Sequence, residues 1–164
     1  MDALVRRLTD AARIASGTLE LFPERTELAD VAMSVIRAFE HDPEHPGVRW
    51  IGEGGPLLVD PTRLRTTLLA FVDAASWWGR EGPVTIAATR NGGTVRIEVA
   101  RLGAELDASA SGGLFDVRRA EVGPGGFGLV VAAGVASAQG GRAWATAEAG
   151  VLTLHLELPV GLDG

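Results

Sequence analysis

The sequence predicts an α+β fold, a two-layer α/β sandwich in which a mixed, mostly antiparallel sheet carries about three helices on one face. Two observations lead to this class. Several short stretches alternate apolar and polar residues, which is the pattern of strands with one buried face. Single helix-length stretches with an apolar stripe separate these strands. Strand pairs interleaved with single helices are typical of an antiparallel sheet covered on one side.

Helical patterns occupy four stretches of the chain, residues 3–16, 26–39, 61–78 and 129–139. Thr26 is expected to cap the second helix, and Pro61 opens the third. Strand patterns occupy seven stretches, residues 18–24, 48–51, 57–60, 83–90, 94–100, 142–147 and 152–158. The turn Asn91-Gly92-Gly93 predicts a β-hairpin between 83–90 and 94–100.

Composition narrows the function classes. With 164 residues and 46% hydrophobic content, the chain is expected to form one globular domain with a short appendage. The net charge is −6 and the charges are scattered, which argues against nucleic-acid binding. The chain has no cysteine, so disulfides and thiolate metal sites are excluded. Its longest apolar run, 129–138, is too short to cross a bilayer, and a cytoplasmic protein without membrane contact is expected.

A glycine cluster, residues 123–128, precedes the last predicted helix. Glycines allow positive φ angles and expose successive N–H groups, and a helix start adds a partial positive charge. This combination is typical of a phosphate cradle. The alternative is a turn that lets a core helix dock. Residues 102–124, before the helix, form a loop long enough to be a lid.

Five segments, in collinear order, carry a family resemblance: 60–69, the hairpin, Gly-Gly-Phe-Gly-Leu at 125–129, 139–144 and the final Leu-Glu-Leu-Pro. Together they resemble the catalytic ATP-binding domain of bacterial sensor histidine kinases, in the Bergerat-fold (GHKL) superfamily. The resemblance covers roughly residues 27–159 and implies an ATPase-type domain over 18–164. Residues 10–17 resemble the end of the family's dimerisation and phosphotransfer hairpin. Residues 1–17 are therefore expected to be the end of such a helix and to pair with a second copy.

The resemblance implies two asparagines on the third helix that help hold magnesium, and here these positions are Ala70 and Ala74. Neither alanine can ligate a cation, and Asp73 lies about 100° away around the helix. Trp77 stands where the family often has a lysine. The side of the third helix that would line the ATP site is therefore expected to be apolar rather than polar. The residues on that side are Ala70, Ala74, Trp77 and Trp78. Magnesium is not expected to bind, and no metal-ligating residue is predicted.

The resemblance also implies an aspartate that accepts from the adenine amino group, and this position is Arg101. A guanidinium has donors only. Glu105 replaces a family glycine, and the closing Gly-Thr is missing near residues 151–152. Arg101 must find a partner or reach water, and Glu105 and Asp73 are the expected partners.

Three histidines are present, and none lies in a sequence that resembles the family's phosphoacceptor box. His41 and His45 are expected in solvent and His155 on the outer face of its strand. No catalytic residue is predicted. The nucleotide-binding prediction, weak at most, rests on retained residues of two loops: Gly103, Gly125, Gly126, Gly128 and Leu129.

Taken together, these observations favour a degenerate histidine-kinase domain, a pseudokinase that acts in two-component signalling through protein contacts with weak or no ATP binding. Its expected partners are a response regulator, another kinase, or a second copy through the N-terminal helix. The alternative is a divergent active kinase that holds ATP through the glycine loop and Arg101 or Arg118. A third class, the anti-sigma-factor serine kinases, is disfavoured by the segment at 10–17.

Overall fold

The structure is a computed structural model that describes residues 5, 9–10, 12–14, 17–105, 113–115 and 126–162. Its centre is a five-stranded sheet with the order β2-β4-β5-β7-β6. The strands are β2 (Val48–Gly52), β4 (Glu81–Asn91), β5 (Thr94–Leu102), β6 (Arg142–Glu148) and β7 (Val151–Pro159). Only β2 and β4 are parallel among these neighbours; the other three pairs are antiparallel. The predicted mixed, mostly antiparallel sheet is confirmed.

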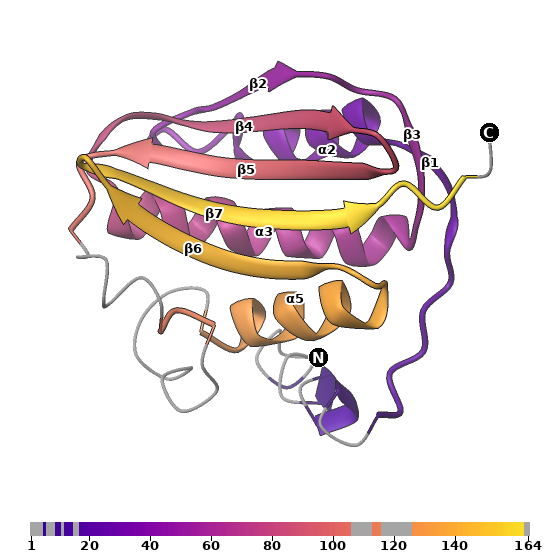
Figure 1. The fold of residues 1–164 in the computed structure, drawn as a ribbon. Helices are drawn as coiled ribbons and strands as arrows, with labels where there is room; N and C mark the ends of the chain where they lie inside the picture. The colour runs from indigo at the N-terminus through magenta and orange to yellow at the C-terminus, as the bar shows by residue number, and fades with distance from the viewer. Residues whose placement is uncertain are drawn as a thin grey trace.

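Three helices cover one face of this sheet (Figure 1): α2 (Leu28–Phe39), α3 (Pro61–Trp78) and α5 (Gly126–Ala138). In the view of Figure 1, α2 and α3 lie behind the strands and α5 lies below β6, so that α3 is between α2 and α5. A second, two-stranded sheet joins β1 (Glu24–Glu27) to β3 (Pro56–Val59) in antiparallel register. The described residues within 3–16 are helical, as predicted, and lie beside α5 (Figure 1).

The core lies between the sheet and the helices. Alternate residues of β4, β5 and β7 point inward, as the period of two predicts. The fully buried large side chains include Leu28, Leu57, Leu64, Leu68, Phe71, Ile86, Ile97, Leu129, Leu152, Leu154, Leu156 and Leu158. The strands β4, β5 and β7 show the expected alternation of buried residues with more exposed ones.

Local chemistry fixes the ends of the helices. Asp60, only 6% exposed, caps α3 by accepting the Arg63 N–H at 3.1 Å, and Pro61 occupies the first turn. The α2 cap is Glu27, whose carboxylate accepts the Ala29 N–H at 3.3 Å, so the expectation of Thr26 was wrong by one residue. Thr26 instead bonds to the carbonyls of Glu24 and Val59.

The predicted strands at 48–51 and 57–60 are present as β2 and β3, which belong to different sheets. Two further sequence predictions need correction. Residues 18–23 form no strand; the strand begins only at Glu24, because the Phe22 N–H bonds to the Asp60 carboxylate rather than to a neighbouring strand. The last helix begins at Gly126, inside the glycine cluster, three residues before the expected start.

Candidate functional site

The candidate site is the region where the C-terminal end of α3 meets the end of β5. The strand β5 runs into Arg101, Leu102 and Gly103, and the backbone there is tied to the chain that leaves α3. The Arg80 N–H donates to the Leu102 carbonyl at 2.9 Å, and the Glu105 N–H donates to the Trp78 carbonyl at 2.8 Å. The two segments are therefore held together before any side chain contributes.

Arg101 fills the junction between them. Its Nη1 donates to the carbonyls of Ser76 at 2.8 Å and Gly79 at 2.6 Å, and its Nε donates to the Gly82 carbonyl at 2.8 Å. The last carbonyls of a helix lack intrahelical partners and carry partial negative charge. The guanidinium thus supplies hydrogen-bond donors to the carbonyl groups at the C-terminal end of α3. Burial, with the nearby Arg80 charge, lowers the pKa of Arg101 from its usual value.

The expectation that Arg101 pairs with Glu105 is wrong. Glu105 forms a two-pronged ion pair with Arg80 instead, at 2.8 and 2.9 Å. Both side chains of that pair are about half exposed, so it contributes little to stability. Arg101 instead donates to the backbone carbonyls of Ser76, Gly79 and Gly82.

Gly79 allows this arrangement. A Cβ at Gly79 would lie 2.7 Å from the Cβ of Arg101 and 2.9 Å from the Ala75 carbonyl oxygen, which is too close for any side chain. Gly103 has a similar structural role. Its φ is +72°, and a Cβ there would lie 3.1 and 3.2 Å from the backbone nitrogens of Glu81 and Arg80. Close packing at Gly79 and the positive φ at Gly103 account for glycine at the two positions.

The side of α3 on which the resemblance implies magnesium ligands carries apolar side chains. Ala74 is fully buried and Ala70 is 7% exposed, and both belong to the core. Asp73 lies on the exposed side of the helix, as the helical spacing predicts. Trp78 packs partly against the core, and its Nε1 has no hydrogen-bond partner among the described residues. Trp77 is 50% exposed, so its expected contribution to this apolar side is wrong.

Phe115 brings one part of the predicted lid to this side of α3. Its ring meets the buried ring of Phe71 edge-on, with 5.7 Å between centroids. Leu114 and Phe115 both pack against the core. The remaining lid residues, 106–112 and 116–125, lie outside the described residues, so the predicted loop over 102–124 is seen only in part.

The predicted nucleotide-binding residues fall into two groups. Gly126, Gly128 and Leu129 lie together in the first turn of α5, and Leu129 is a core residue, 1% exposed. Gly103 lies at the end of β5. Gly125 is outside the described residues. A helix start with several glycines can present N–H groups to an anion, and a buried Leu129 anchors that start in the core.

The histidines differ from expectation in one case. His45 is half-buried, not in solvent: its ring stacks on Phe39 at 4.2 Å, and its Nε2 lies 2.9 Å from the Ser76 hydroxyl. Burial is the main cause that lowers its pKa. His41 is exposed. His155 lies on the outer face, as predicted, stacked on Trp144 at 4.7 Å, and burial likewise lowers its pKa.

Among the described residues, no group of three or more histidine or acidic side chains is arranged to hold a metal ion. No helix in the described part of the chain is long and apolar enough to span a membrane. Described residues line a surface hollow of about 450 Å³ between α2 and the start of α3, and another of about 350 Å³ on the outer face of the sheet.

Comparison with known proteins identifies the fold. The sequence matches no protein-family model and no curated protein. Solved structures do match. Histidine kinase AdeS of Acinetobacter baumannii superposes with a TM-score of 0.81 at 18% identity, over 97% of this chain and 78% of that chain. Full-length ShkA, solved with AMPPNP, gives 0.82 at 23% identity, over 99% of this chain but 36% of that chain.

The catalytic domain of histidine kinase ThkA matches over its whole length, with a TM-score of 0.73 at 17% identity and 87% of this chain covered. The chain therefore has the fold of a histidine kinase ATP-binding domain, as the sequence resemblance implied. At these identities the likeness establishes the fold, and the function of the site is a separate question.

Proposed function

We propose that this chain is a degenerate histidine-kinase domain, a pseudokinase that acts in two-component signalling through protein contacts, with weak or no ATP binding. The observation that carries the proposal is Arg101. The position implied to accept from adenine holds a cation, Arg101, that donates hydrogen bonds to the carbonyls of Ser76, Gly79 and Gly82. Binding adenine in the family manner would require an acceptor where Arg101 offers only donors.

The loss of magnesium ligands supports the same reading. Magnesium binds oxygen ligands, and Ala70 and Ala74 present buried methyl groups at the two implied positions. An ATP triphosphate without its metal keeps a large uncompensated charge. The glycines of α5 could offset only part of that charge with N–H groups.

The competing function is a divergent active kinase, and one observation favours it. The helix α5 begins inside the glycine cluster, so Gly126 and Gly128 lie where N–H groups can point away from the helix. On this alternative ATP binds through that helix start and through arginines. Arg118 lies outside the described residues, and Arg101 is already occupied by backbone carbonyls. We therefore favour the pseudokinase.

The partners follow from the proposal. Histidine kinases are among the matched solved structures, and the family resemblance of the sequence implies a response regulator as a partner. A pseudokinase domain that keeps the fold but not the nucleotide chemistry would act by binding such a regulator or another kinase in the cytoplasm. A second copy, joined through the N-terminal helix, is the other proposed partner.

Calorimetric titration with ATP tests the proposal, once with magnesium and once with EDTA. We expect little or no heat of binding, and no gain from magnesium. A large magnesium-dependent gain in affinity would contradict the pseudokinase and favour the active kinase. ADP is the control ligand. It keeps the adenine but lacks the γ-phosphate, so its titration measures recognition of the adenine separately from that of the γ-phosphate.

A further inference from the structure

The helix α5 has an apolar surface on more than its core-facing side. Leu129, Ala132 and Ala136 face the core. A different part of the helix, at Gly134, faces the N-terminal segment, by which we mean the described residues among 5–23. A helix with apolar residues on all sides must pack against other parts of the protein on each side. At Gly134 the N-terminal segment packs against it.

Ile14 makes this contact. A Cβ placed on Gly134 would lie 2.5 Å from Cγ2 and 2.6 Å from Cδ1 of Ile14. Gly134 does not have a positive φ, so its backbone conformation does not require glycine. Glycine inside a helix is unfavourable relative to alanine. The close approach of Ile14 is thus the local reason for glycine at this position.

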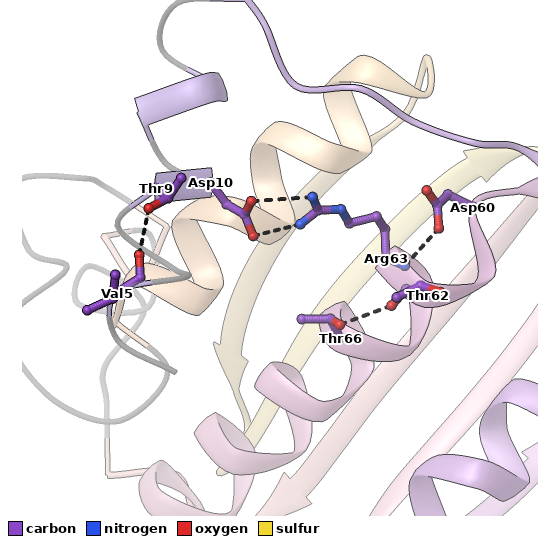
Figure 2. Close-up of polar contacts among 7 residues, drawn as sticks. All are labelled: Val5, Thr9, Asp10, Asp60, Thr62, Arg63 and Thr66. Atoms are coloured by element: carbon purple, nitrogen blue, oxygen red, sulfur yellow. Dashed lines mark hydrogen bonds and ion pairs between the residues drawn. The ribbon is translucent and has the colours of Figure 1, made fainter. Parts of the chain in front are cut away.

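One helical turn before Ile14, Asp10 binds the start of α3 (Figure 2). Arg63 Nη1 donates to Asp10 Oδ2 at 2.7 Å, and Nη2 donates to Oδ1 at 3.3 Å. The side chains are only 20% and 19% exposed. A cation in the first turn of a helix opposes the helix dipole, and Asp10 compensates for it. Asp10 and Ile14 are four residues apart and so lie on one helical face.

Asp60 connects this contact to the far end of α5. Its carboxylate accepts the N–H groups of Phe22 and Arg63, at 3.0 and 3.1 Å. Its own N–H donates to the side-chain oxygen of Gln139, directly after α5, at 3.0 Å. The N-terminal segment and the start of α3 therefore meet at the buried carboxylate of Asp60, and the chain after α5 meets the backbone of the same residue.

Among the described residues of the helical part, Asp10 and Ile14 are half-buried, whereas Val5, Thr9, Ala12 and Arg13 are exposed. A terminal segment can open locally while the sheet stays folded. We propose that the N-terminal segment is a reversible clamp, held by Asp10–Arg63 and Ile14–Gly134, whose docking determines how rigidly α5 is held. The clamp does not depend on nucleotide binding. The experiments below can therefore contradict the clamp without contradicting the proposed function, and ATP titration can contradict the proposed function without contradicting the clamp.

A disulfide tests the docked state. The chain has no cysteine, so Ile14→Cys with Gly134→Cys introduces the only pair. The short distances from the Gly134 Cβ position to the Ile14 side chain fit the Cβ separation of about 3.5–4.5 Å that a disulfide requires. We expect an intramolecular bond under mild oxidation. Free thiols, or a bond between two chains, would overturn the clamp.

Hydrogen exchange tests what docking does. In Arg63→Ala we expect the amides of α5 to exchange about tenfold faster, because the partly buried ion pair is lost, while β4 and β5 are unchanged. Arg65→Ala, on the exposed side of the same helix, is the matched control and should leave α5 unchanged. Closing the disulfide should slow exchange in α5.

The charge swap Asp10→Arg with Arg63→Asp gives the final arm of the test. It restores the ion pair with the signs reversed, so protection of α5 should return to near the wild-type level. Faster exchange throughout the sheet in Arg63→Ala, or no rescue by the swap, would mean that the contact is a fixed part of the core, and the clamp would be wrong.

Discussion

Arg101 donates a 2.8 Å hydrogen bond to the carbonyl oxygen of Ser76, three residues before Gly79, the C-cap of α3. This bond joins the end of a central strand to the end of the longest helix. Arg101→Ala should therefore destabilise the fold by about 1–3 kcal/mol, the usual loss when hydrogen bonds from a charged donor are removed. Urea unfolding measures it, with the exposed Arg49→Ala as a control expected to change stability by less than about 0.5 kcal/mol.

Arg101→Asp should destabilise more than Arg101→Ala. It places a carboxylate against the carbonyl oxygens of Ser76, Gly79 and Gly82, at the negative end of α3. We also expect that it does not restore ATP binding unless Ala74→Asn is added. Thermal melts and ATP titrations of the single and double variants decide this. Tight ATP binding by Arg101→Asp alone, with an unchanged Tm, would show an intact, open pocket.

Ala74→Asn by itself should weaken the fold. Ala74 is fully buried, so an asparagine there adds volume and an amide without partners. Such changes typically cost about 1–3 kcal/mol. Arg65→Asn, on the exposed side of the same helix, is the matched control. If Ala74→Asn were as stable as the wild type, this part of α3 would border an open site.

Phe115→Ala should remove the contact between the lid and the core. The edge-on pair with Phe71 and the partial burial of Phe115 suggest a loss of about 1–2 kcal/mol. Hydrogen exchange at 113–115 should increase, while β4 stays protected. The exposed Leu102→Ala provides the comparison for a large apolar side chain without that contact. Unchanged exchange would mean that Phe115 does not hold the lid.

The sequence predicted the elements well because their patterns are local. The helix Pro61–Trp78 and the hairpin of β4 and β5 follow from periodicity, capping and turn residues. The partner of Arg101 could not be predicted, because it depends on how closely the end of α3 approaches β5. The prediction of a strand at 18–24 was wrong at 18–23 for a similar reason. The sequence there alternates apolar and polar residues, but the Phe22 N–H donates to Asp60, which is distant in sequence.

The polar loop around His45 predicted exposure, yet the ring is half-buried between Phe39 and Ser76. Its contacts fix its protonation state. The Gly47 N–H lies 3.3 Å from Nδ1, so Nδ1 accepts and carries no proton. Nε2 therefore carries the hydrogen and donates to the Ser76 hydroxyl, which donates to the Val72 carbonyl at 2.7 Å. Protonation of Nδ1 would place its N–H against the N–H of Gly47, so that two hydrogen-bond donors would face each other.

The last prediction is that acid weakens the fold through His45. Burial lowers its pKa below the usual 6.5; Asp42 and Asp73 oppose this, and Arg101 adds to it. A lowered folded-state pKa favours the neutral ring, so its stabilising contribution is present above pH 6.5 and is lost as the pH falls through the folded-state pKa. His45→Gln should flatten that part of the loss in Tm, whereas the exposed His41→Gln should not. Equal slopes in wild type and His45→Gln would show that the ring contributes nothing to the pH dependence.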